Sequence, residues 1–130
     1  MNSAKLRGTI IGFEEYQNYE LNPVAGEISP FRLLSCVDTP LSFIVISPFS
    51  IVDDYALEVS DTIAHGLQLH DGTVDDVAVL CVVRLAEEVC YINLRSPIIV
   101  NTKGGLFAQV VLENENYSSS TPFVMKEVRG

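Results

Sequence analysis

The sequence predicts an all-β fold: a small closed or partly open antiparallel barrel or sandwich with one short helix. Short apolar runs rich in β-branched residues alternate with turn residues along the chain, as in proteins built from many short strands. One run, residues 41–46, is apolar on both faces, and such a strand belongs inside a sandwich or a closed barrel. Only residues 60–67 carry the signals of a helix.

The first part of the chain predicts edge strands and turns. Residues 1–7 are short and polar and predict an edge strand only, whereas glycines bracket the apolar residues 8–13 as at a strand end or a tight bend. Residues 16–21 alternate and predict a strand with Tyr19 and Leu21 on one face. Residues 22–28 contain a proline and a glycine and predict a loop.

A β-hairpin is predicted at the centre of the fold. Two apolar runs, residues 31–37 and 41–46, are separated by an Asp-Thr-Pro connection, and both Asp and Pro favour turns. In the second strand, one face carries Leu41, Phe43 and Val45. We therefore expect Phe43 to be a core residue, with a cost of about 3–5 kcal/mol when it is truncated to alanine.

The middle of the chain predicts a strand-like segment and then the helix. In residues 51–59, an alternating pattern allows Tyr55, Leu57 and Val59 to face inward while acidic residues face water. Ser60 can cap a helix over residues 60–67, and Gly66 suits the left-handed position at its C-terminal end.

The second half of the chain predicts more strands joined by short turns. Residues 77–83 are all apolar and mostly β-branched, which indicates a buried strand. A short acidic connection leads into residues 89–94, so that a second hairpin is predicted. Residues 98–100 and 106–112 predict two further strands, and residues 123–124 could dock back onto the sheet.

Length and composition predict one domain over residues 1–130, because 48% of the residues are hydrophobic and can build a core. No apolar run approaches the roughly 20 residues that cross a bilayer, and no signal region follows the first residues. We therefore expect a cytoplasmic protein with no membrane partner. Cys36, Cys81 and Cys90 lie in apolar runs and predict buried free thiols, although a Cys81–Cys90 disulfide would be possible in an oxidising compartment.

The charge balance argues against nucleic acid as a direct partner. Seventeen acidic residues against eight basic ones give a formal net charge of −9, and the basic residues are scattered. A protein that binds nucleic acid by itself needs a positive patch for the phosphates. The acidic balance either keeps the protein soluble or attracts a basic protein.

The sequence contains no recognisable catalytic, cofactor or metal site, so we expect that the protein is not an enzyme. Acidic residues occur as adjacent pairs, and neighbours on a strand point to opposite faces, so they cannot act as one acid–base pair. No nucleophile elbow or phosphate-binding loop is present. His65 and His70 lie five residues apart, which is not a helical face spacing, and are expected to be ordinary surface histidines.

Several motifs along the chain occur together in the order of one known family. Residues 8–16, GTIIGFEEY, and residues 29–49, the predicted hairpin, resemble the opening motif and the central hairpin of the bacterial flagellar assembly factor FliW family. Residues 93–102, NLRSPIIVNT, followed by residues 109–112 and 117–118, are similar to its C-terminal signature. The resemblance covers roughly residues 8–123 in the same order.

This resemblance implies a non-enzymatic small β-barrel protein with two protein partners. One is flagellin, and the other is the RNA-binding translational repressor CsrA, whose inhibition of flagellin synthesis FliW relieves. When free flagellin is scarce, FliW is released to occupy CsrA. We expect this chain to act as a monomer. Two alternatives remain open: a flagellin-specific chaperone that never binds the repressor, and a β-barrel that binds a small molecule, which would require an apolar cavity inside the barrel.

The candidate binding residues follow from charge, because an RNA-binding repressor must present positive surface. Acidic residues flanking the docking face would speed the encounter with such a partner. Tyrosines lying among them would be the aromatic anchors. The predicted partner-binding residues are Asp53, Asp54, Tyr55, Glu58, Glu113, Glu115 and Tyr117.

Overall fold

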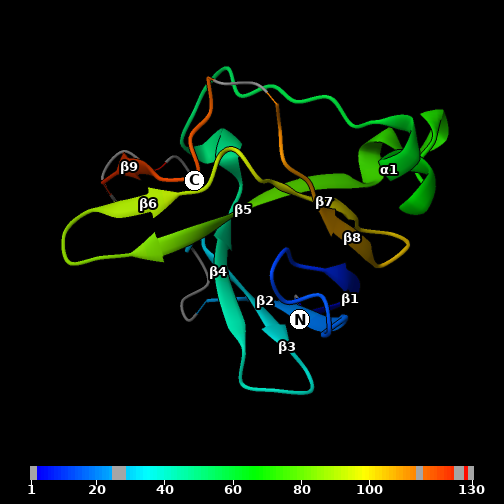
Figure 1. The fold of residues 1–130 in the computed structure, drawn as a ribbon, viewed down its shortest axis with the longest axis horizontal. Helices are drawn as coiled ribbons and strands as arrows, with labels where there is room; N and C mark the ends of the chain where they lie inside the picture. Colours follow the sequence, from blue (N-terminus) through cyan, green and yellow to red (C-terminus); the bar gives the residue numbers. More distant parts are fainter. Residues whose placement is uncertain (1–2, 25–28, 114–115, 125–127, 129–130) are drawn as a thin grey trace.

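In the computed structural model the chain forms a nine-stranded β-sheet, with residues 3–24, 29–113, 116–124 and 128 described (Figure 1). The strand order is β4-β3-β2-β1-β8-β7-β5-β6-β9, and β4 also pairs with β5, which closes the first seven of these strands into a barrel. The strands are β1 (Ala4–Thr9), β2 (Asn18–Pro23), β3 (Arg32–Cys36), β4 (Ser42–Ile46), β5 (Val77–Leu85), β6 (Cys90–Ile92), β7 (Ile98–Asn101), β8 (Leu106–Gln109) and β9 (Thr121–Phe123). The predicted all-β fold is confirmed, in its closed form.

One seam of the barrel is parallel. β1 pairs with β8 in parallel, with Gly8 opposite Phe107, whereas the other pairings of the sheet are antiparallel. A Cβ on Gly8 would lie 2.1 Å from the Phe107 carbonyl oxygen, so only glycine fits this close approach of backbones. The prediction of a strand end or tight bend over residues 8–13 is confirmed, because β1 ends at Thr9. The prediction that residues 1–7 form only an edge strand is wrong, since β1 pairs with β2 on one side and with β8 on the other. The bend comes at Gly12, whose φ is 94°.

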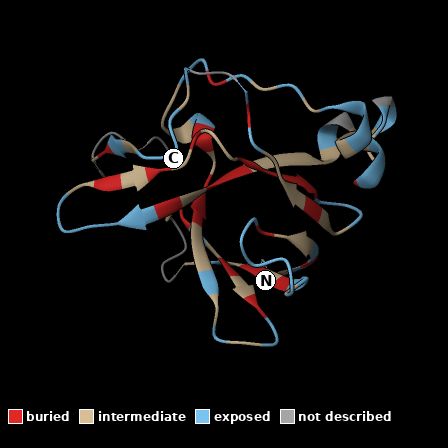
Figure 2. Cartoon of the chain, in the orientation of Figure 1, coloured by how far each residue is buried: buried red, intermediate tan, exposed pale blue. Residues whose placement is uncertain are grey.

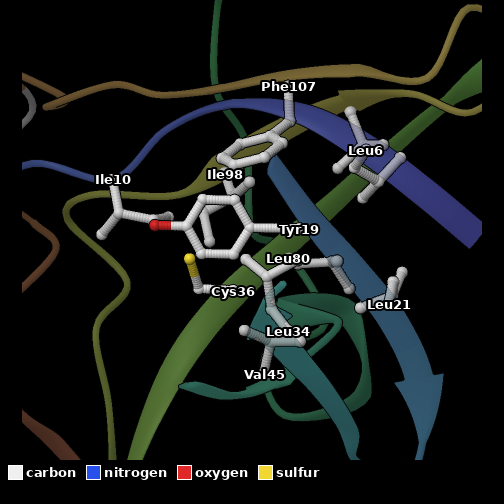
Figure 3. Close-up of a cluster of buried hydrophobic side chains, with 11 residues drawn as sticks. Leu6, Ile10, Tyr19, Leu21, Leu34, Cys36, Val45, Leu80, Ile98 and Phe107 are labelled. Carbon is white, nitrogen blue, oxygen red and sulfur yellow. The ribbon is translucent and has the colours of Figure 1, made fainter. Parts of the chain in front are cut away.

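The sheet separates two hydrophobic cores. Eleven buried side chains from seven strands and the β1–β2 turn fill the barrel interior, among them Tyr19, Leu34 and Phe107 (Figure 3). A second core lies on the other side of β4 and β5, against β6, β9 and the irregular segments that follow β4 and β8. β4 and β5 serve both cores, because their alternate residues point to opposite sides. Figure 2 shows buried residues on both of these strands and on other strands of the sheet, including β7, whose four residues are all buried.

The predicted hairpin is confirmed as β3 and β4, with Leu34 opposite Phe43. On β4, Val45 points into the barrel and Ile46 into the second core, and both are fully buried. The structure corrects one detail: Phe43 is only half-buried, packing at the margin of the barrel core with its ring edge-on to the exposed Phe13 ring at 5.4 Å. The fully buried positions of this strand are therefore Val45 and Ile46, and Phe43, two residues before Val45, is not one of them.

The middle of the chain differs from the prediction in two places. Residues 51–59 form no strand, although the alternation holds: Tyr55 is buried, Leu57 and Val59 are half-buried, and Glu58 is exposed. The helix is confirmed as α1 (Asp61–Gly66), with the Ser60 side chain accepting a hydrogen bond from the Ile63 N–H. The left-handed residue after it is Gln68, with φ of 61°, and not Gly66.

Two 3₁₀ helices flank this region, η1 (Pro48–Ser50) and η2 (Asp71–Asp76). The second hairpin is confirmed as β5 and β6. β8 ends at Gln109, three residues before the predicted end of its strand, and β2 extends through Pro23 into the predicted loop, of which residues 25–28 lie outside the described residues. All three cysteines are buried and free, so the prediction of buried free thiols is confirmed.

Candidate functional site

The two sequence segments that carry the predicted binding residues lie against each other. The Ala56 N–H donates a hydrogen bond of 2.8 Å to the Tyr117 hydroxyl, across 61 residues of sequence. The Tyr55 and Tyr117 rings also pack together, with centroids 4.6 Å apart. In Figure 1 the green segment after η1 runs across the top of the molecule, and the orange segment after β8 rises to meet it.

Tyr55 holds this junction from the inside. Its side chain is only 5% exposed, its hydroxyl donates a 2.7 Å hydrogen bond to the Leu94 carbonyl, and the Phe49 ring packs edge-on at 5.7 Å. Burial, together with the nearby Cys81 thiol, raises the pKa of the Tyr55 hydroxyl. Tyr55 therefore holds the two segments together from the inside, and its role as an aromatic anchor for a partner stays a prediction. Alternation alone had already pointed it inward.

Tyr117 is less deeply buried than Tyr55. It is half-buried and packs against the second core, while its hydroxyl accepts from the Ala56 N–H. Of the two predicted aromatic anchors, Tyr117 is the one that a partner can reach.

The predicted carboxylates lie at the surface of the same junction. Asp53 and Asp54 are exposed in the turn that precedes Tyr55, and Glu58 and Glu113 are exposed on the two segments. Glu115 lies outside the described residues. We call Asp53, Asp54, Glu58 and Glu113 the acidic set.

Between the two segments lies an open groove of about 900 Å³. Its floor and walls are mostly aliphatic, and the carboxylates of Glu58 and Glu113 border it from opposite segments. None of the described residues that line it is basic. The lining residues are Ala56, Leu57, Glu58, Val59, Ser60, Ile63, Gln109, Val110, Val111, Leu112 and Glu113.

Sequence reasoning found the acidic border of this groove but missed its aliphatic lining. Val111 is 55% exposed, although it lies in a run that predicts a continuous strand. The length of that run, residues 106–112, gave no signal, because the equally long run of residues 77–83 lies within a strand over its whole length. The early end of β8 lets residues 110–113 leave the barrel and form a wall of the groove.

The histidines take no part in this groove. His70 caps η2, its Nδ1 accepting a hydrogen bond from the Gly72 N–H, and His65 is exposed near the end of α1. Within the described part of the chain, no cluster of three or more His, Cys, Asp or Glu residues is arranged to hold a metal ion. Among the same residues, none of the helices has the length and apolar character needed to span a membrane.

Comparison with known proteins identifies the family. The family model described as FliW protein matches residues 3–123 of this chain. The chain belongs to the FliW family. A crystal structure of the flagellar assembly factor FliW superposes with a TM-score of 0.80 at 31% identity, covering 89% of this chain and 82% of that chain.

Relatives named flagellar assembly factor FliW agree with this assignment. The protein from Clostridium beijerinckii is 34% identical over 118 residues, which cover 88% of this chain and 82% of that relative. The protein from a Geobacillus species is 36% identical over 113 residues, covering 85% of this chain and 76% of the relative. The protein from Geobacter sulfurreducens is 34% identical over 123 residues, covering 92% and 75%. The FliW resemblance seen in the motifs is confirmed.

Proposed function

We propose that this protein is a non-enzymatic regulator of flagellar assembly that binds the translational repressor CsrA and relieves its repression of flagellin synthesis. Flagellin is the competing partner: when free flagellin is scarce, more of the regulator is available to occupy the repressor. Both partners are present in the cytoplasm, where the protein acts as a monomer. Membership of a family whose relatives are named flagellar assembly factors supports the flagellar role.

The observation that carries the choice of site is the acidic set beside the groove. A repressor that binds RNA presents positive charge, and the chain carries a formal net charge of −9. Asp54, Glu58 and Glu113 are exposed, so they can act on an approaching partner through solvent. We expect them to speed association more than they tighten the complex. Tyr117 supplies an aromatic contact at the same place.

Small-molecule binding inside the barrel is the less favoured reading. It would require an apolar cavity in the barrel, whereas eleven buried side chains pack together there (Figure 3). The groove lies outside, between the segments that follow β4 and β8.

Co-purification tests the partners first. The protein should retain CsrA when flagellin is absent and release it when flagellin is added. Retention of flagellin alone would instead identify a flagellin-specific chaperone. The protein by itself should shift no RNA in a gel, because its eight basic residues are scattered along a sequence with seventeen acidic ones.

Stopped-flow association with CsrA at rising salt tests the steering. We expect the association rate to fall roughly tenfold or more as salt screens the charges, and the double variant D54N/E58Q to associate more slowly. The matched control is E87Q/E88Q, which removes the same charge from exposed positions on the β5–β6 turn, far from the groove (Figure 1). A rate that ignores salt, or that changes equally in both double variants, would refute steering by the acidic set.

Y117A tests the aromatic contact in the same assay. We expect it to raise the dissociation rate, since tyrosines at interface centres contribute strongly to binding. Normal binding of both partners by a folded Y117A variant would remove Tyr117 from the site.

A further inference from the structure

We propose that the groove binds an extended polypeptide segment with basic side chains, which adds to the protein as a β-strand. This inference rests on the proposed function for its location, because the groove borders the acidic set, but it specifies the form and chemistry of what binds there. Its evidence is the backbone on the two sides of the groove.

One wall, residues 110–113 just beyond β8, presents an extended backbone edge with unpaired N–H groups among the described residues. The N–H groups of Val110 and Leu112 donate to the carbonyls of Pro97 and Arg95, at 3.0 and 2.8 Å. In an extended chain, alternate residues direct their N–H and C=O groups to opposite edges. Val111 and Glu113 therefore direct their N–H and C=O groups to the other edge. Within the described residues, neither of these two N–H groups donates a hydrogen bond.

The opposite wall, which is not a strand, also has N–H groups that donate to nothing in the described part of the chain. The Ala56 N–H is taken by the Tyr117 hydroxyl. The following N–H groups, those of Leu57, Glu58 and Val59, donate to nothing in the described part of the chain. Strand edges with free N–H and C=O groups are templates for an added strand, and several peptide-binding domains recognise extended segments in this way.

The size and shape of the groove suit a short strand. Residues 110–113 span about 13 Å when extended, at roughly 3.3 Å per residue, which is the length of four peptide residues. A groove of about 900 Å³ leaves room between the walls for such a segment and its side chains.

The lining specifies the side chains of the occupant. Aliphatic surface from Leu57, Ile63 and Val111 favours apolar residues on one face of the added strand. Glu58 and Glu113 border the groove with no basic lining residue among those described, so lysine or arginine on the other face would be paired. The same carboxylates would repel the phosphates of RNA, which makes a peptide the matching occupant.

The test uses a hexapeptide of alternating lysine and valine, acetylated and amidated at its ends, added to ¹⁵N-labelled full-length protein. We expect amide shifts confined to residues 56–63 and 109–113, and slower hydrogen exchange at the N–H groups of Val111 and Glu113. A peptide with glutamate in place of lysine should not bind. Two further peptides carry N-methyl groups on either the odd or the even residues. The one methylated on the N–H groups that face the protein should bind about tenfold or more weakly, because methylation removes those hydrogen-bond donors, whereas the other should bind normally.

Two variants place the contact in the groove. E58Q/E113Q should weaken the lysine–valine peptide roughly tenfold, while E87Q/E88Q should not. V111P removes one edge donor and should abolish binding, whereas V111A keeps that donor and should retain most of it. The peptide controls decide the question if V111P does not fold. Shifts elsewhere on the protein, or equal binding of every N-methylated peptide, would overturn the inference.

Competition with CsrA separates this inference from the proposed function. Peptide binding in the groove without displacement of CsrA would support the strand mode and move the repressor site elsewhere. The opposite result would be that D54N/E58Q weakens CsrA binding, while the peptide at millimolar concentration shifts no amide signal of the groove residues. That result would support the proposed function and overturn the strand mode.

Discussion

Two buried tyrosines show how much depends on a single hydroxyl. Tyr55 is buried beside the second core, and its hydroxyl donates to the Leu94 carbonyl at 2.7 Å. Tyr19 is 1% exposed inside the barrel, and its buried hydroxyl has no hydrogen-bond partner among the described residues. The ring of Tyr19 nevertheless packs edge-on against Phe107 at 5.4 Å. The two side chains are thus equally enclosed but differ in whether the polar atom is satisfied.

The same substitution should therefore have opposite effects at these two positions. Y55F removes a bonded donor and leaves the Leu94 carbonyl unpaired, so we expect a loss of about 1–2 kcal/mol in the free energy of unfolding. Y19F removes an unsatisfied buried group and should be neutral or stabilise by about 1 kcal/mol. Urea unfolding of both variants measures the difference. A similar loss from both would show that Tyr19 finds a partner in solution.

Cys81 gives the fold a sensitivity to high pH. Burial raises the pKa of its thiol from the usual 9.0 to about 12. Above pH 9 the unfolded chain ionises first, so stability is complete below that pH and falls by about 1.4 kcal/mol per pH unit as the pH rises toward the folded value. Urea melts between pH 8 and 10.5 should show this slope, and C81A should reduce it. Identical slopes in the two proteins would contradict the assignment.

At the scale of elements, β4 and β5 form a partition between the two cores. Val45 and Leu80 face the barrel interior, while Ile46 and Cys81 face the second core, on the same two strands. Pairing of Ile46 with Cys81 and of Val45 with Val82 fixes this alternation, because a register shift of one residue would exchange the faces. A cavity on either side therefore weakens a strand that both cores use.

The cross-strand pair Leu34 and Phe43 tests the position of this core. Leu34 is fully buried, so L34A should cost about 3–5 kcal/mol, whereas the half-buried Phe43 should cost only about 1–3 kcal/mol on truncation to alanine. The revised value for Phe43 replaces the larger one expected from the sequence. Urea melts give both numbers, and a larger loss from F43A than from L34A would reverse this assignment of the core.

Elements with strict alternation could be predicted from the sequence, and the way irregular segments pack could not. Tyr19 and Leu21 were correctly placed on one buried face, because period two is a local property of a strand. Residues 52–59 show the same alternation without a ladder, since burial against the second core also selects every second residue of an extended segment. The acidic residues that border the groove could be predicted from their charge. The groove itself could not be predicted, because it depends on where β8 ends.

At the scale of the whole molecule, closure of the barrel depends on two contacts distant in sequence. β1 joins β8, and β4 joins β5, so the N-terminal meander of β1 to β4 is held at both of its edges by the second half of the chain. At the parallel seam a Cβ on Gly8 would collide with the Phe107 carbonyl oxygen, so the pairing of β1 with β8 needs glycine at this position. The groove then lies outside the closed barrel, on segments that closure leaves unpaired.

Gly8 tests this closure. We expect G8A to cost at least about 3 kcal/mol, because its Cβ would meet the Phe107 carbonyl oxygen, and relief requires the seam to open. The matched control is G66A in α1, where a Cβ would meet nothing within 4 Å, so alanine should be neutral or slightly stabilising. Thermal melts compare the two. Equal stability of G8A and the parent protein would mean that the seam tolerates a wider spacing.

The parallel seam also has a consequence during synthesis. A chain that leaves the ribosome N-terminus first can form the antiparallel ladders of β1 to β4 early, but the second edge of β1 must wait for Leu106–Gln109. Until then that edge of β1 has no paired strand, and an unpaired strand edge can pair with a neighbouring nascent chain on the same mRNA. We expect chains that terminate before residue 106 to aggregate or to be degraded quickly, so that cells accumulate the full-length barrel and few stable fragments.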